Sequence, residues 1–269
     1  GLVAAVEMHP ETLLSPKSIS LMDLIFFELL LEIDHLDTEL GTKWQPIASL
    51  TNQLPLQLLA EVENTEYQEV MKIWQNGTGT NITSLENKAF PNDMDISNGN
   101  VYVVGYEKQA DTALNVFENN WKNNIVQTRI GNSTSVLNGI KVIGTDIYTV
   151  GTFNNTTVCR INGTAQTYFI NATMKDIVVD NNTRYISGVS QNKAVCWIND
   201  SLINLSSPFL TESSADGIAV NSSDVYIAGY EKIATGKKKA RYWLNAQSLT
   251  LNDSSSLESL ANSIYVVKQ

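Results

Sequence analysis

Three aspartates hold similar places in a repeating sequence and are the residues most able to do chemistry. Asp93, Asp176 and Asp216 each stand just before a short apolar segment that has the character of a strand. If the repeats surround an axis, these carboxylates line one mouth of a central channel. A pair of carboxylates about 5–10 Å apart can serve a glycoside hydrolase as acid and as base or nucleophile. Carboxylate oxygens could also bind a cation, and aspartates before strands are common in purely structural turns.

Two Tyr-Glu pairs form a second group of candidates. Tyr106-Glu107 and Tyr230-Glu231 each follow another strand-like segment, at the same place in two repeats. A ring beside a carboxylate can stack on and hydrogen-bond a sugar or a peptide, although a solvated strand end would look the same. The candidate ligand-binding residues are therefore these four and the three aspartates, and we assign no catalytic residue and no metal ligand.

Other chemistry is poorly supplied. The two histidines, His9 and His35, stand outside the repeats, so no repeated histidine site exists for zinc or for acid–base work. The sequence holds no nucleophile elbow, phosphate loop or dinucleotide fingerprint, and we predict no cofactor. Cys159 and Cys196 occupy one position in consecutive repeats, too far apart for a disulfide, so we expect two free thiols.

Two sequence elements recur about every forty residues, a spacing that indicates a β-propeller. One is an aliphatic-Tyr segment, and the other is Trp-x-Asn with Arg160 in one Trp position. A tryptophan that recurs at one position favours packing between sheets over a row of sugar platforms. The tyrosines are Tyr102, Tyr148, Tyr185, Tyr226 and Tyr265, and the tryptophans are Trp74, Trp121, Trp197 and Trp243.

The ends of the repeat region set the predicted number of blades. The region starts with segments of the third and fourth type, the first at Lys72–Asn76. It stops with segments of the first and second type, at Leu257–Leu260 and Ile264–Val267. Joining the two halves removes open sheet edges. We therefore predict a mainly β fold, a five-bladed β-propeller closed by two strands plus two, with Lys72–Asn76 paired to Ile264–Val267.

The part before the repeats predicts helices. Ser20 can cap a helix that runs to about Leu40, and a second helix is expected from about Leu56 to Met71. We therefore divide the chain into a helical amino-terminal segment, 1–70, and a propeller domain, 71–269. The first helix is apolar around most of its circumference, so it must pack against the propeller or against a second copy. We expect packing within the chain and a monomer.

Composition limits the class of partner. A net charge of −10 argues against nucleic acid, and no apolar run is long enough to cross a membrane. The many Asn-x-Ser/Thr triplets could accept glycans, but turns also select these residues. The first residue is Gly1, which is consistent with a removed leader.

Asp224-Val225-Tyr226-Ile227-Ala228-Gly229-Tyr230-Glu231 and Arg241-Tyr242-Trp243-Leu244-Asn245 resemble repeats of secreted or lipid-anchored β-propellers of bacterial cell envelopes. The five-bladed shape is similar to tachylectin-type lectins, although their sugar-binding motifs are absent. The resemblance implies an extracytoplasmic binding or scaffold module whose partner is a glycan or a protein at the cell surface. A glycoside hydrolase that uses the axial carboxylates is the alternative, and we favour the binding module over an enzyme.

Overall fold

The computed structural model describes residues 2–7, 57–63, 69–75, 78–83, 87–109, 116–123, 125–131, 135–153, 156–232, 236–251 and 258–266. Their regular elements are all β-strands, and no helix occurs among them. The strands are β1 (Leu2–Glu7), β2 (Gln57–Glu63), β3 (Glu69–Gln75), β4 (Thr78–Asn81), β5 (Asn87–Ser97), β6 (Asn100–Gln109), β7 (Val116–Lys122), β8 (Ile125–Gly131), β9 (Val136–Ile143), β10 (Asp146–Phe153), β11 (Thr156–Ile161), β12 (Thr164–Phe169), β13 (Ala172–Asp180), β14 (Thr183–Ser190), β15 (Lys193–Ile198), β16 (Ser201–Asn204), β17 (Glu212–Asn221), β18 (Asp224–Lys232), β19 (Lys238–Leu244), β20 (Gln247–Thr250) and β21 (Leu260–Val266).

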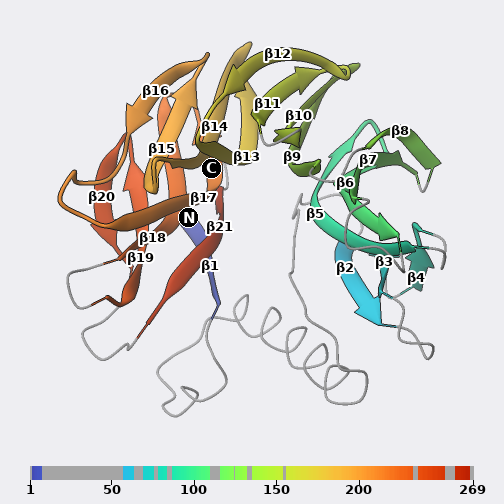
Figure 1. The fold of residues 1–269 in the computed structure, drawn as a ribbon, viewed down its shortest axis with the longest axis horizontal. Helices are drawn as coiled ribbons and strands as arrows, with labels where there is room; N and C mark the ends of the chain where they lie inside the picture. Colours follow the sequence, from blue (N-terminus) through green and yellow to red (C-terminus); the bar gives the residue numbers. More distant parts are fainter. Residues whose placement is uncertain are drawn as a thin grey trace.

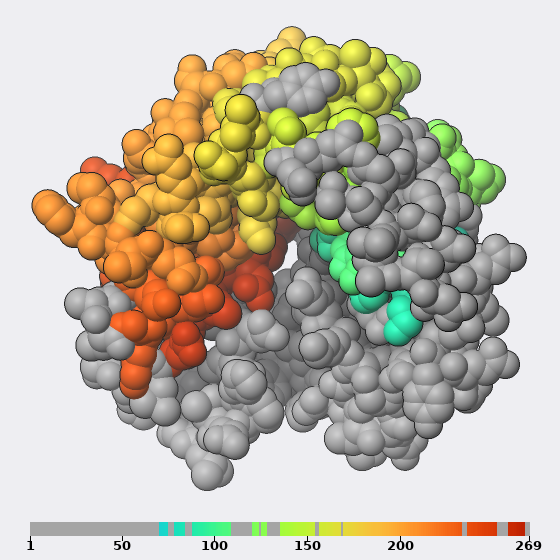
Figure 2. Space-filling view, viewed as in Figure 1, coloured from blue at the N-terminus to red at the C-terminus, as the bar shows by residue number. Residues whose placement is uncertain are grey.

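The strands form six antiparallel sheets. Four sheets have four strands each, in the orders β5-β6-β7-β8, β9-β10-β11-β12, β13-β14-β15-β16 and β17-β18-β19-β20. A fifth sheet has the three strands β2-β3-β4, and a sixth has the two strands β1-β21. In Figure 1 the first strand of each four-stranded sheet lies toward the middle and the fourth lies outside. The sheets therefore follow one another around a centre, as the space-filling view in Figure 2 also shows for β9 to β20.

A recurring asparagine explains the tight hairpins at one end of these sheets. In the four Trp-x-Asn elements whose Asn is described, that Asn takes up positive φ, which short hairpin turns need and which Asn tolerates. Its side-chain oxygen accepts a hydrogen bond of 2.9 Å from the N–H near the start of the second strand, and so ties three strands together. The pairs are Asn123 with Val101, Asn162 with Ile147, Asn199 with Arg184, and Asn245 with Val225. This geometry favours turn selection over glycosylation for the described triplets at Asn162 and Asn199.

Each innermost strand carries a β-bulge at the same place, and a glycine faces four of the five bulges. A Cβ on that glycine would collide with a carbonyl oxygen of the innermost strand, for example Phe90 O at Gly105 and Ser214 O at Gly229. The repeated Gly after the aliphatic-Tyr segment therefore marks a strand that lies against a bulge. The bulged residues are Asn92, Asn138, Lys175, Asp216 and Asn262, and the glycines are Gly105, Gly151, Gly188 and Gly229.

The predicted ring closure is wrong. The strand β3, which contains Lys72 to Gln75, pairs with β2 and β4, whereas β21 pairs with β1. Furthermore, β21 is one innermost strand and not a first and second strand in succession, because it has the bulge at Asn262. Ser259, just before β21, accepts a hydrogen bond from Ala240 N at 3.0 Å, as Ser213 does from Ala194 N at 2.9 Å. The two half-repeats thus belong to separate sheets, and the five-bladed ring is not formed.

The predicted helix from Leu56 to Met71 is also wrong. This stretch holds β2 and the first three residues of β3, and the two strands pair in register from Gln57 opposite Gln75 to Glu63 opposite Glu69. Tertiary packing decides the outcome, since Val70 and Met71 are buried at 1% and 0% exposure and Met71 packs in a cluster with Trp121. The predicted helix from Ser20 to Leu40 lies outside the described residues. Among the described residues no helix is long and apolar enough to span a membrane.

Three of the four tryptophan positions form cores between sheets, as predicted, whereas Trp74 is only partly buried. Trp121, Trp197 and Trp243 are at most 1% exposed. Arg160, which replaces Trp in the sheet β9–β12, is also buried, with its guanidinium carbon 5.2 Å from the centre of the Phe153 ring. Cys159 and Cys196 are both buried and free, which confirms the prediction of two thiols.

Candidate functional site

The candidate residues fall into two groups with different surroundings. Asp93, Asp176 and Asp216 lie inside the innermost strands, at or next to the bulges, and not before the strands as the sequence suggested. The Tyr-Glu pairs lie among the last four residues of β6 and of β18, at the end of the sheets opposite to the Asn hairpins. The charge of Asp216 contributes to the raised pKa of Tyr230, so the structure brings these two candidates near each other.

Asp93 and Asp176 connect neighbouring sheets through the backbone. One Asp93 oxygen accepts the N–H of Met94 at 2.8 Å, and the other accepts the N–H of Ile140, in the next innermost strand, at 2.8 Å. Asp176 repeats this arrangement with Ile177 at 2.7 Å and with Ile218 at 2.9 Å. Both oxygens of each carboxylate are thus occupied by main-chain donors, which is a structural use of the carboxylate.

The same position alternates between aspartate and glycine around the innermost strands. It holds Asp93, Gly139, Asp176 and Gly217 on β5, β9, β13 and β17. A Cβ at Gly139 would lie 3.0 Å from the Cα of Asp176, and a Cβ at Gly217 would lie 2.8 Å from the Cα of Ser263 on β21. Where the position is glycine, the next innermost strand can approach closely. Where it is aspartate, the carboxylate accepts a hydrogen bond from the next innermost strand.

Burial controls the protonation of these carboxylates. Burial raises the pKa of Asp93 well above its usual range, and the nearby charge of Asp176 adds to this, although the N–H groups of Ile140 and Met94 oppose it. Burial likewise raises the pKa of Asp176, against the N–H groups of Ile218 and Ile177. Asp93 and Asp176 are thus close enough to repel each other. Raised pKa values are often found in catalytic acids, but here both carboxylates already hold the fold together.

Asp216 differs from the other two aspartates. It is the bulged residue of β17 and accepts a hydrogen bond of 2.6 Å from the hydroxyl of Ser214. Burial raises its pKa, and the Ser214 hydroxyl opposes that shift. Asn92 and Asn138, in the same bulge position, donate to the next innermost strand instead, to Leu137 O at 2.6 Å and Met174 O at 2.7 Å. The three aspartates therefore do not form one carboxylate triad.

The Tyr-Glu pair of β18 splits into an accessible ring and a buried acid. Glu231 is 6% exposed and accepts a hydrogen bond of 2.8 Å from Arg241 Nε. The Tyr230 hydroxyl donates to Glu212 at 2.8 Å, and Lys238 Nζ lies 4.4 Å from the centre of its ring. Burial and the Glu212 carboxylate raise the pKa of Tyr230, while the Tyr230 and Lys232 hydrogen bonds lower the pKa of Glu212.

The pair of β6 has a similar division but different neighbours. Glu107 is 6% exposed, as its counterpart on β18 is. Tyr106 stacks on Phe90 at 4.8 Å between ring centres, and Lys108 Nζ lies 5.0 Å from the Phe90 ring and 5.5 Å from the Tyr106 ring. Both predicted glutamates are thus withdrawn from solvent, and the accessible groups at this end are the tyrosines and lysines.

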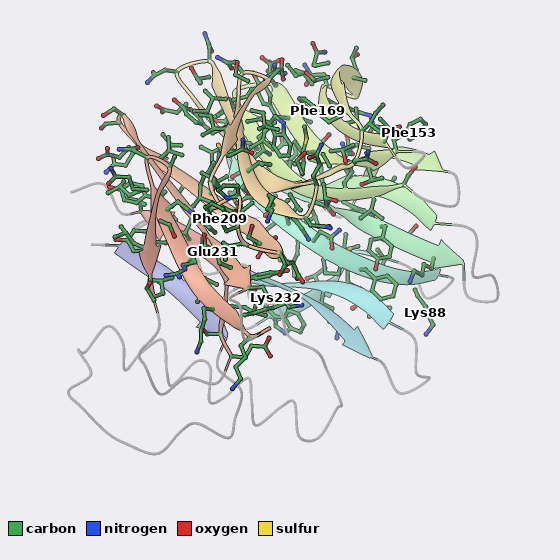
Figure 3. The ribbon with its side chains drawn as sticks, turned by 60° about the vertical axis from the view of Figure 1, so that its left-hand side comes forward. Lys88, Phe153, Phe169, Phe209, Glu231 and Lys232 are labelled. Carbon is green, nitrogen blue, oxygen red and sulfur yellow. The ribbon has the colours of Figure 1, made fainter. Side chains whose placement is uncertain are left out.

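Sequence reasoning missed several residues of this end of the sheets. Glu212, Lys232 and Lys238 surround Tyr230, with Lys232 at 3.2 Å and Lys238 at 3.5 Å from the Glu212 carboxylate. Phe209, in the segment before β17, is 94% exposed. Figure 3 shows Phe209, Glu231 and Lys232 on the side of β17 and β18, with Lys88 across the molecule. The Lys237-Lys238-Lys239 run was the available signal, but nothing in the sequence placed Glu212 beside it.

Metal ligands do not gather in the described part of the chain. Over the described residues, no group of three or more His, Cys, Asp or Glu side chains has the geometry of a metal site.

Comparison with known proteins gives a local match to a transporter subunit. Over 76 residues the chain is 47% identical to the probable inorganic carbon transporter subunit DabA of Nitrosospira multiformis, which covers 28% of this chain and 8% of that protein. Over 75 residues it is 44% identical to the subunit of the same name from Azotobacter vinelandii, covering 28% and 9%. The chain thus spans less than a tenth of these curated relatives. No protein-family model matches it.

The solved structures found by comparison are distant. A structure from a study of two prolyl endopeptidases has a TM-score of 0.42 at 10% identity and covers 77% of this chain and 34% of that one. A puromycin-hydrolyzing peptidase of Mycobacterium tuberculosis has a TM-score of 0.38 at 7% identity and covers 82% and 46%. Likeness at this level carries no inference about function.

These findings correct the predicted function. The curated relatives are named as transporter subunits, and neither name refers to a secreted protein, a lipoprotein, a glycan-binding protein or a glycosidase. The prediction of an extracytoplasmic binding or scaffold module, with a glycoside hydrolase as alternative, is therefore wrong. The place of the chain in the cell stays a prediction.

Proposed function

We propose that this chain is an accessory component of an inorganic carbon transport assembly and acts by associating with another protein of that assembly. The observation that carries the proposal is the local identity of 44–47% to two DabA subunits. The relatives are named as subunits, so a protein partner is the natural counterpart. Because the chain spans only 8–9% of them, the proposal concerns association and not the transport step.

The division of the chain supports this role. The part of the chain that precedes the repeats, which start near Lys72, differs in charge from the rest. That part is strongly acidic: residues 1–70 contain twelve Asp and Glu but only two Lys and no Arg, whereas Asp and Glu balance Lys and Arg in residues 71–269. An acidic first part is thus joined to a part in which the acidic and basic residues balance.

The inner carboxylates support association over chemistry. In Asp93 and in Asp176, each carboxylate oxygen accepts a hydrogen bond from a backbone N–H group, and the two donors belong to two different sheets. A carboxylate held in this way stabilises a rigid framework. The described sheets therefore serve as a platform that presents surface to a partner.

Co-purification from cells tests the proposal. The full chain, carrying an affinity tag, is produced together with the subunits of an inorganic carbon transporter, and the purified material is probed for the DabA subunit. Uptake of labelled bicarbonate is measured in the same cells with and without the chain. We expect the subunit to co-purify and uptake to change. If the subunit is absent from the purified material and uptake is the same in both cells, the proposal is wrong.

A further inference from the structure

One end of the sheets forms a continuous surface that the hairpin end lacks. There the second strand of each sheet leads to the third, and the fourth leads to the next innermost strand. We call it the connector face and define it by Ile170, Asn192, Phe209, Lys232, Lys237 and Lys238, which lie at this end of β12 to β19.

Backbone hydrogen bonds join the parts of the connector face. Gln191 N donates to Asn171 O at 3.2 Å, which links the turn after β14 to the connector that follows Ile170. Ser213 N donates to Asn192 O at 3.0 Å, which links the same turn to the start of β17. Phe209 and Glu212 are three positions apart in the chain, so their Cα atoms are within about 11 Å. These links place Ile170, Asn192, Phe209 and Glu212 along the same end of β12 to β18.

Two apolar side chains of the connector face are left in solvent. Phe209 is 94% exposed and Ile170 is 79% exposed, the two highest values among the exposed large hydrophobic side chains of the described residues. Phe209 lies in a turn in which Leu210 N donates to Ser207 O at 3.3 Å. Aromatic side chains held in solvent on a turn are typical anchors of protein interfaces.

The lysines give the connector face a positive charge. Glu212 accepts from the Tyr230 hydroxyl and lies beside both Lys232 and Lys238, and Glu258 accepts from Lys238 N at 3.3 Å, so two carboxylates lie among the three lysines. Lys237 is exposed next to them. By contrast, the hairpin end of the same sheets carries four aspartates, Asp146, Asp180, Asp200 and Asp224. The two ends thus differ in sign, which orients an incoming charged partner.

We propose that the connector face binds an acidic segment of a partner protein, with Phe209 against apolar side chains of that segment and Lys232, Lys237 and Lys238 facing its carboxylates. This inference rests on the proposed function and adds to it the surface and the chemistry of the partner. Charge complementarity selects an acidic segment, and the apolar anchors select one that also carries apolar side chains.

Binding of a synthetic peptide tests the connector face directly. The probe is a short fluorescent peptide of glutamates with two leucines, and its control replaces the glutamates by lysines. We expect the full chain to bind the acidic peptide only, with an affinity that falls as salt rises. Phe209→Ser combined with Lys237→Glu should weaken binding about tenfold or more. The matched control, Ile125→Ser with Lys122→Glu, changes an exposed apolar residue and a lysine away from the face and should bind as the natural chain does.

The outcomes separate this inference from the proposed function. If the Phe209→Ser, Lys237→Glu chain keeps its melting temperature and still co-purifies with the DabA subunit, the connector face is not the interface and the inference is wrong. If the natural chain binds the acidic peptide but does not co-purify with the subunit, the proposed function is wrong, whereas binding of an acidic segment by the connector face is supported. Binding to phosphatidylserine vesicles without binding to the peptide would make the face a membrane surface and overturn the inference. Self-association that Lys237→Glu abolishes, without peptide binding, would do the same in favour of a second copy.

Discussion

The four-stranded sheets and the two-stranded β1–β21 sheet use the same kind of innermost strand but different second strands. In the complete sheets the second strand places a glycine opposite the bulge, and the third strand supplies a buried tryptophan or Arg160. In the sixth sheet β1 pairs with β21 across the Asn262 bulge. The residue of β1 at this bulge is Val6, where the complete sheets have a glycine. The comparison shows that an innermost strand can hold its shape beside a second strand that lacks the repeat sequence.

Removal of a sheet-to-sheet tryptophan should have the largest effect on the complete sheets. Trp243→Ala deletes a side chain with 0% exposure and should lower the free energy of unfolding by about 3–5 kcal/mol. Leu249→Ala, in the neighbouring strand β20 and 40% exposed, is the matched control and should cost about 1 kcal/mol or less. Chemical denaturation measures both values. An unchanged denaturation midpoint for Trp243→Ala would contradict a packing role.

The glycine opposite a bulge should be the next most sensitive position. Gly229→Ala forces a Cβ against Ser214 O, so we expect a loss of about 3 kcal/mol. Gly163→Ala provides the comparison, because Gly163 has φ 79° and no atom near its absent Cβ. Only the cost of the left-handed conformation remains there, about 1–2 kcal/mol. Equal losses at the two glycines would show that the bulge can move to accept a side chain.

The inner aspartates should give the complete sheets a distinctive dependence on pH. Because burial raises the pKa of Asp176 in the folded state, its contribution to stability is largest below the usual Asp pKa of about 3.9 and falls as pH rises through the raised value. Asp176→Asn should therefore flatten the curve of unfolding free energy against pH above about pH 4. Gln166→Ala, exposed on β12 and without a titratable group, is the control and should leave the slope unchanged. The same slope in Asp176→Asn and in the natural chain would refute the effect.

The smallest effect should be seen in the exchange of backbone hydrogens. β14 has a hydrogen-bonded strand on each side, whereas β1 pairs with β21 alone. Amide groups of Leu2–Glu7 should therefore exchange faster than those of Thr183–Ser190, as read by mass spectrometry of the full chain. Equal protection of the two strands would mean that β1 is held as firmly as a strand of a complete sheet.

The sequence was a reliable guide where local chemistry repeats. The Trp-x-Asn turns, the buried tryptophans and the four-stranded sheets from β5 to β20 follow from residues that hydrogen-bond or pack in the same way each time. The prediction that Tyr265 lies in a second strand was wrong, and it was made because Tyr265 resembles the tyrosines of the second strands. The decisive signs were the Asn262-Ser263-Ile264 run, which matches Asp216-Gly217-Ile218, and the missing glycine after Tyr265.

The rest depended on contacts that no local pattern encodes. β2 carries neither a repeat motif nor a glycine, and its strand form depends on its pairing with β3. The burial of Glu107 and Glu231 likewise depends on neighbouring strands, as the Arg241 partner of Glu231 shows. Function depended on comparison with other proteins, since the acidic first part of the chain has no motif that names a partner.

The alternation of aspartate and glycine along the innermost strands constrains how such a chain can grow. Asp93, Gly139, Asp176 and Gly217 make two adjacent sheets, and not one, the unit that repeats. Duplication or loss of a single sheet would bring two aspartates or two glycines next to each other. With two aspartates the neighbouring strand would lack room, and with two glycines the bridging carboxylate would be missing. Gains and losses of sheets in the ancestry of this chain should therefore have occurred in pairs.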